Sequence, residues 1–204
     1  PPDTLKTITL PAGGTIAAAY KASPSYKDAS GALLNPTLPI AIQTVSSITE
    51  TDPVAGVSGA TFYEYAGGRY YFKGLTDRRF AGFAQVTATK PDGSKRSTYF
   101  NVADEGKIGK PVRAELLDAA GVVIKRTLTS WTVTPLATLG ASRFLTTPDA
   151  NVSMDFGAGG THRDRAARST YDLATGALLS VLDYGEVSAD AATSTPVFTD
   201  VASD

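Results

Sequence analysis

The chain has 204 residues, of which 42% are hydrophobic and 19% charged, so it holds enough apolar material to form a domain core. Its 19 lysines and arginines nearly balance 20 aspartates and glutamates, which excludes a global electrostatic attraction to nucleic acid. The absence of cysteine excludes disulfides and thiolate metal sites. No apolar run approaches the ~20 residues of a membrane-spanning helix, so we expect no direct membrane insertion.

The first part of the chain has the pattern of short β-strands separated by proline and glycine. Strands are expected within "LKTITL" (5–10), "GGTIAAAY" (13–20) and "PIAIQTVSSIT" (39–49), which are rich in β-branched residues or alternate in polarity. The opening "PPDTLKTITL" lacks the pattern of a signal peptide and reads as an interior piece of a longer chain.

The middle of the chain carries two strong turn signals. In "ATFYEYAGGRYYF", Gly67 and Gly68 lie between aromatic arms, which predicts a hairpin turning at this pair. In "TATKPDGSKRS", proline presets φ for a turn at Asp92 and Gly93, with the glycine in the left-handed conformation. We therefore expect two antiparallel hairpins, one turning at Gly67 and Gly68 and the other at Asp92 and Gly93.

One short element recurs along the chain: an aspartate, two or three residues, a glycine and then aliphatic residues. It appears as "DASGALL" (28–34), "DAAGVVI" (118–124) and "DLATGALL" (172–179). An aspartate side chain can accept a hydrogen bond from the backbone two residues on, and glycine closes the turn at positive φ. The three copies predict three hairpin turns, each leading into a strand, with Gly121 and Gly176 at positive φ.

The segment after the third copy is apolar on both faces of its expected strand. Alternation places Leu178, Leu182 and Tyr184 on one side and Leu179 and Val181 on the other. A sheet with one face in water should instead alternate between apolar and polar residues. We expect this hairpin to be covered on both faces or to enter a larger shared sheet.

These segments resemble a known family. "YDLATGALLSVLDYGEV" (171–187) is similar to the YD repeat of RHS proteins, which begins with Tyr-Asp, turns near a glycine and closes on Asp-Tyr-Gly. "YEYAGGRYYFKGLTDRRFAGFAQVTATKPDGSKRSTYF" (63–100) resembles the block that precedes these repeats in the B component of insecticidal toxin complexes. The motif residues that carry the resemblance are Tyr171, Asp172, Gly176, Tyr184, Gly185, Arg79, Phe80, Gly82, Phe83, Asp92 and Gly93.

The resemblance implies an all-β fold in which antiparallel hairpins form a large curved sheet, part of a hollow shell around a C-terminal effector polypeptide. It divides the chain into a β-rich lead-in (1–59), a hairpin array (60–187) and a C-terminal loop with a short strand (188–204). The implied partners are the rest of the parent toxin polypeptide and its effector, with self-association through strand edges. The implied location is outside the bacterial cell or on its surface. The shell wall should be lined by Val122, Ile124, Leu179 and Val181.

Little in the sequence points to catalysis. His162 is the single histidine, and no Gly-x-Ser-x-Gly elbow supplies a nucleophile to complete a triad with Asp164. Without a second histidine or any cysteine, a metal site has few ligands. The glycine-rich run 157–161 lacks the Lys-Ser/Thr of a phosphate loop. We expect no enzyme, no cofactor and no metal, with His162 a solvated strand residue.

Some further features allow a functional interpretation as well as a structural one. Arg163, Arg165 and Arg168 could bind phosphate, but charge that protects a sheet edge is favoured. In the "DRRF" segment, Asp77 and its arginines could form a paired site, whereas Gly82 with Phe80 and Phe83 indicates a structural turn. Stacking on sugar rings would make the chain an extracellular carbohydrate-binding β-sandwich, the alternative to a shell segment; a hydrolase ranks below both. The aromatic set concerned is Phe62, Tyr63, Tyr65, Tyr70, Tyr71 and Phe72.

Overall fold

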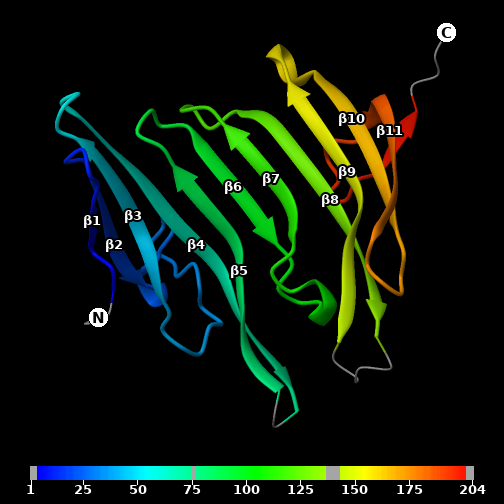
Figure 1. The fold of residues 1–204 in the computed structure, drawn as a ribbon, viewed down its shortest axis with the longest axis horizontal. Coiled ribbons are helices and arrows are strands. Elements are labelled where there is room, and N and C mark those ends of the chain that lie inside the picture. The colour runs from blue at the N-terminus through cyan, green and yellow to red at the C-terminus, as the bar shows by residue number, and fades with distance from the viewer. Residues whose placement is uncertain (1–3, 75–76, 137–142, 201–204) are drawn as a thin grey trace. The chain divides into compact units, whose positions relative to one another are not determined.

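The computed structural model describes residues 4–74, 77–136 and 143–200 and is built almost entirely of β-strands (Figure 1). Within these residues the only helical segments are 3-10 turns of three residues, and no helix is long and apolar enough to cross a membrane. The strands are β1 (Thr7–Thr9), β2 (Thr15–Ala22), β3 (Gln43–Asp52), β4 (Val57–Lys73), β5 (Asp77–Thr89), β6 (Lys95–Phe100), β7 (Pro111–Leu117), β8 (Val123–Pro135), β9 (Phe144–Phe156), β10 (His162–Tyr171), β11 (Leu178–Ala189) and β12 (Phe198–Asp200).

The strands follow one another in the sheet in the order of the sequence, from β1 to β12. The sheet is therefore open, because its first and last strands are not neighbours. The antiparallel pairing confirms the all-β prediction and is consistent with a curved sheet of hairpins. The last short strand expected near the C-terminus is present as β12, whereas residues 1–3 and 201–204 of the outer predicted segments lie outside the described residues.

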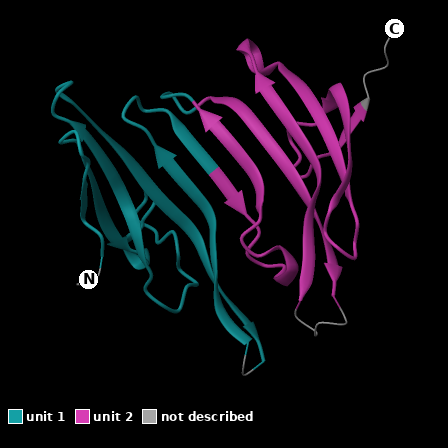
Figure 2. Ribbon diagram, in the orientation of Figure 1, with its two compact units in different colours: residues 1–97, 118–121 teal, residues 98–117, 122–204 magenta. Residues whose placement is uncertain are grey.

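The chain divides into two compact units (Figure 2). Unit 1 comprises residues 1–97 and 118–121 and contains β1 to β5, while unit 2 comprises residues 98–117 and 122–204 and contains β7 to β12. Each unit has its own set of buried side chains. The three-part division of the chain at residues 59 and 187 stays a prediction.

The hairpin predicted at Gly67 and Gly68 is wrong. Strand β4 continues through both glycines, and its hairpin with β5 joins Phe62 to Thr89 at one end and Lys73 to Asp77 at the other. Gly67 has φ +64° and lies between Ala66, which pairs with Gln85, and Gly68, which pairs with Phe83. Both glycines therefore lie inside a long strand, and its register with β5 does not shift until Arg69.

A loop before β3 explains why these two positions need glycine. The Asn35 side chain is buried, donates to the carbonyls of Ser23 and Tyr65, and accepts from the Gly68 N–H at 2.7 Å. The Gly67 N–H donates to Leu34 O at 2.9 Å. A Cβ on Gly68 would lie 3.0 Å from Asn35 Oδ1, so a side chain there would collide with the loop. The glycines provide close approach between two backbones rather than a turn.

The core of unit 1 is a chain of aromatic rings. Tyr65 of β4 lies 5.7 Å from the ring of Tyr26 and 5.0 Å from that of Phe83, which in turn lies 5.2 Å from Phe80. Phe80 and Phe83 both lie inside β5, so the prediction that they anchor a turn is wrong. Gly82 has φ +100° at a register shift opposite Arg69, which is the bulge conformation that favours glycine.

The core of unit 2 lies on one face of β8 to β11. Leu128, Val152 and Met154 are fully buried, and Ala166 and Val187 join them. Register explains the clustering, because Leu128 pairs with Val152 and Val152 with Ala166 across three adjacent strands. The segment after β11 covers this face, where Ala191 and Phe198 pack against the cluster.

The predicted turns at Gly93, Gly121 and Gly176 are confirmed, with φ values of +82°, +86° and +77°. At Asp28 the turn also forms, since its carboxylate accepts the N–H of Ser30 at 2.9 Å. No strand follows it, however, and only an isolated bridge forms in this loop. The prediction that all three aspartate-glycine elements lead into strands is therefore wrong for the first copy.

Candidate functional site

The hairpin of β10 and β11 has a tightly organised turn. Tyr171 ends β10, and Asp172 Oδ1 accepts the N–H of Ala174 at 2.8 Å while its other oxygen accepts the Thr175 hydroxyl at 2.8 Å. The Gly176 N–H donates to Asp172 O at 2.7 Å. Bonds from Ala174 and Thr175 to the carboxylate lower the pKa of Asp172, because they favour its charged form. The turn joins the two strands at the pair Tyr171 and Leu178, after which the register shifts by one residue before the pair Thr170 and Ser180.

The first half of β11 is apolar and uncovered. Leu178, Leu179, Val181 and Leu182 are each 55–67% exposed. Successive side chains of a strand point to opposite faces, so both faces of this half carry exposed aliphatic residues. The prediction that the segment after Gly176 is apolar on both faces is confirmed, and within the described residues neither face is covered there. We call these four residues the apolar wall.

The second half of β11 is covered instead. Tyr184 stacks on Phe198 at 5.1 Å between ring centres, and Val187 and Ala189 are buried. The change occurs at Gly185, which has φ +66° and lies at a register shift between Ala166 and the next residue of β10. The sequence Asp-Tyr-Gly is therefore a bulge inside the strand and not its end.

A buried carboxylate holds the covering segment in place. Asp164 is 3% exposed; its Oδ2 accepts the Ala189 N–H at 2.9 Å and its Oδ1 lies 2.7 Å from His162 Nδ1. The His162 ring packs on Phe156 at 5.3 Å. His162 is therefore a partly buried, paired residue, and the expectation of a solvated strand histidine is wrong. No local sequence pattern indicates the bond between Asp164 and Ala189, which lie 25 positions apart.

The arginines of β10 do not gather in one patch. Arg163 pairs with Glu186 at 3.4 Å, and Arg168 lies over the Phe198 ring at 5.4 Å. Arg163 and Arg165 share one face of the strand and Arg168 takes the other. The prediction that these arginines protect a sheet edge is also wrong, because β10 pairs on both sides, with β9 and with β11.

The other residues expected to line a shell wall are also exposed. Val122 is 60% and Ile124 43% exposed, near the start of β8 and in the same unit as the apolar wall. Unit 2 thus has exposed aliphatic residues at the start of β8 and at the start of β11. Several such residues in one unit expose more apolar surface than a single surface leucine would.

A family model described as the insecticide toxin TcdB middle/N-terminal region matches residues 1–109. The chain belongs to this family. No curated protein matches it. The match makes the chain a segment of a toxin-complex protein, which the resemblance in the sequence implied, and the Tyr-Asp stretch at 171–187 lies outside the matched residues.

The motif residues between β4 and β6 lie inside the part matched by the TcdB family. Arg79 lies over the Tyr71 ring at 5.1 Å, and Tyr70 stacks on Phe72 at 4.9 Å. Asp92 Oδ1 accepts the Ser94 N–H at 2.9 Å, which closes the turn between β5 and β6. These residues thus organise a hairpin and its turn.

The described residues bear on three other functions: metal binding, a charged pair at Asp77, and stacking on sugar rings. Within that part of the chain, no group of three histidine, cysteine or acidic side chains could hold a metal ion. Arg78 lies over the Phe72 ring at 5.7 Å, and Asp77 pairs with Lys73 across the end of the β4–β5 hairpin. Of the aromatic set, Phe62 and Tyr63 line one of the two cavities described in unit 1, whereas Tyr70 and Tyr71 line neither.

Proposed function

We propose that the chain is a non-catalytic structural segment of an RHS/YD-repeat toxin shell that encloses a C-terminal effector polypeptide. Membership of the TcdB family supports a structural role in a toxin-complex protein. The apolar wall carries the finer proposal, because its four exposed aliphatic residues need a cover that the described chain does not supply.

The energy of covering the wall favours contact with another polypeptide. Full burial of an aliphatic side chain contributes roughly 1.5–3 kcal/mol. Four such residues on one strand are enough to stabilise a neighbouring element that lies against them. In a shell built of successive hairpins, one face of this strand would meet a neighbouring part of the wall and the other would face the enclosed polypeptide.

The strands at the two ends of the sheet support the same role. β1 and β12 have three residues each, and within the part of the chain that the structure describes each pairs with a single strand. Their free edges carry unpaired backbone N–H and C=O groups that can accept another strand. A longer toxin polypeptide would continue the sheet at these edges, and an exported shell would deliver its effector outside the producing bacterium.

The non-catalytic part of the proposal has its own test. Asp164 uses both oxygens for His162 and Ala189, which gives the pair a structural task. A panel of ester, peptide, glycoside and phosphoester substrates should show no turnover above background. Turnover that disappears in His162→Ala would refute this part of the proposal.

The shell is tested in the complete parent toxin polypeptide. We would replace the wall by Leu178→Ser, Leu179→Ser, Val181→Thr and Leu182→Ser and measure how fast protease digests the C-terminal effector segment. The proposal expects digestion to accelerate in this variant. Leu33→Ser with Val54→Ser, which removes two other exposed aliphatic side chains, is the control and should leave the rate unchanged. If the effector segment is digested equally slowly in wild type, the wall variant and the control variant, the shell proposal is contradicted.

A further inference from the structure

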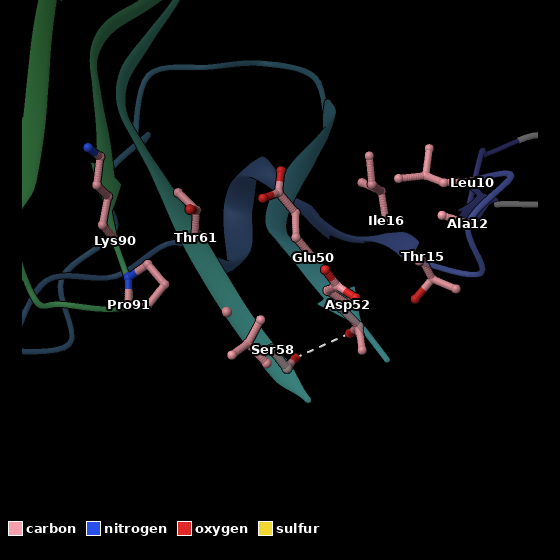
Figure 3. A pocket seen from close by; sticks show the side chains of 14 residues that line it. Leu10, Ala12, Thr15, Ile16, Glu50, Asp52, Ser58, Thr61, Lys90 and Pro91 are labelled. Atoms are coloured by element: carbon pink, nitrogen blue, oxygen red, sulfur yellow. Dashed lines mark hydrogen bonds between the residues drawn. The ribbon is translucent and has the colours of Figure 1, made fainter. Parts of the chain in front are cut away.

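A hollow lies on the face of β2, β3 and β4 in unit 1, far along the chain from the apolar wall. Its central row runs across the three strands, where Ile16 pairs with Glu50 and Glu50 with Gly59. Gly59 has no side chain, and Pro91 of the β5–β6 turn lies against it and closes that side of the hollow, since a Cβ on Gly59 would lie 3.0 Å from Pro91 Cγ. Figure 3 shows Glu50 between Ile16 and Thr61.

The walls of the hollow are aliphatic. Leu10 and Ile16 form one side, Val57 and Pro91 the other, and the cavity measures about 710 Å³. Gly14, just before β2, also lines the hollow. Polar side chains line it as well, among them Thr15, Thr61 and Lys90. A cavity of this size that combines aliphatic walls with polar groups has the character of a small-molecule site.

Two carboxylates give the hollow its charge. Glu50 and Asp52 are two residues apart on β3, so their side chains share one face with α-carbons about 7 Å apart. Asp52 Oδ1 accepts the N–H groups of Val54 and Ala55, which leaves its second oxygen for a ligand. Among the described residues, neither carboxylate takes part in an ion pair. The ammonium group of Lys90 points away from Glu50 in Figure 3.

We propose that this hollow binds an aliphatic diamine. Two carboxylates on one face match two ammonium groups, and the aliphatic walls match the methylenes between them. A stem of about five carbons, slightly longer than the lysine side chain, can lie along the walls while its charged ends remain near the carboxylates and water. The inference concerns unit 1 only and does not depend on the role of the apolar wall.

The test is binding of cadaverine to the protein, measured by calorimetry and compared with pentylamine and pentanol. Exposed ion pairs contribute modestly, so we expect affinity to fall about three- to fivefold from cadaverine to pentylamine, and again to pentanol. Glu50→Gln should weaken cadaverine about three- to fivefold, whereas Glu64→Gln, the same charge change on β4 outside the hollow, should not. Added salt should weaken cadaverine and leave pentanol unchanged.

A second variant tests the walls. Gly59→Val places a side chain in the hollow beside Glu50 and should abolish cadaverine binding, with thermal unfolding measured to show that the variant is folded. Equal binding of cadaverine and pentylamine would overturn the diamine assignment. Binding unchanged in both Glu50→Gln and folded Gly59→Val, or no binding to the wild type, would overturn the site itself.

Discussion

The two halves of strand β11 both carry apolar side chains but have opposite surroundings. Leu179 and Val181 in the first half are more than half exposed, while Val187 and Ala189 in the second half are buried. The difference comes from the segment that follows the strand, which returns over the second half and places Phe198 on Tyr184. Apolar sequence alone thus does not decide burial; the presence of a covering element does. In the proposed shell, the rest of the toxin polypeptide is that element for the first half.

The largest expected effect comes from a matched pair of leucines. Leu128→Ala removes a fully buried side chain in unit 2 and should lower the free energy of unfolding by about 2–5 kcal/mol. Leu179→Ala, at 67% exposure, should change it by no more than about 0.5 kcal/mol in the isolated chain. Urea denaturation of both variants measures the contrast. Similar losses would mean that the first half of β11 is covered after all.

Backbone strain provides the second contrast. Gly176 has φ +77°, so Gly176→Val should cost about 1–3 kcal/mol. The added Cβ would also lie 3.1 Å from Leu145 Cδ1. Ala177→Val, one residue on and without positive φ, is the control and should cost much less. If thermal unfolding shows the two variants to be equally stable, the turn before β11 does not require glycine at position 176.

The covering segment itself can be loosened. Asp164→Ala leaves the Ala189 N–H and His162 without their buried partner, and we expect a loss of about 1–3 kcal/mol. Hydrogen exchange at Ala189 and Phe198 should accelerate while exchange at Leu182 changes little. If exchange instead accelerates uniformly along β11, the two halves of the strand open together, and the covering segment does not stabilise the second half alone.

The smallest effect concerns pH. Hydrogen bonds to its carboxylate lower the pKa of Asp172 below its ordinary value of 3.8. The stabilising contribution of the turn is therefore present above the ordinary value and is lost as pH falls through the folded-state pKa. The thermal midpoint of wild type should fall slightly more than that of Asp172→Asn between neutral pH and this acid range. Identical pH profiles would argue against a role for the ionised carboxylate.

Local chemistry predicted the turns, and long-range contacts account for the errors. The turns at Gly93, Gly121 and Gly176 were predicted correctly, because an aspartate or a proline a few residues before each glycine specifies the turn. Gly67 was misplaced because its conformation depends on Leu34, 33 residues away. The bond from Asp164 to Ala189 could not be foreseen, since nothing local marks either residue as a partner.

The candidate site shows the same division. The presence of apolar residues on both faces of residues 178–182 was predicted from alternation, whereas the expected cover over both faces is not present among the described residues. The sheet position of β10 was not predicted, because pairing with β9 depends on a register that no single segment contains. The hollow beside Glu50 arises from glycines and a proline on three separate segments, so only the folded chain brings it together.

The central claim is that the apolar wall requires a cover, and its most direct test is the mass of the isolated chain in solution across concentration. We expect sedimentation to show association that grows with concentration and disappears when Leu178, Leu179, Val181 and Leu182 are replaced by serine or threonine. The Leu33→Ser and Val54→Ser control should associate like wild type. A chain that remains monomeric at every concentration, with or without the wall, would contradict the account.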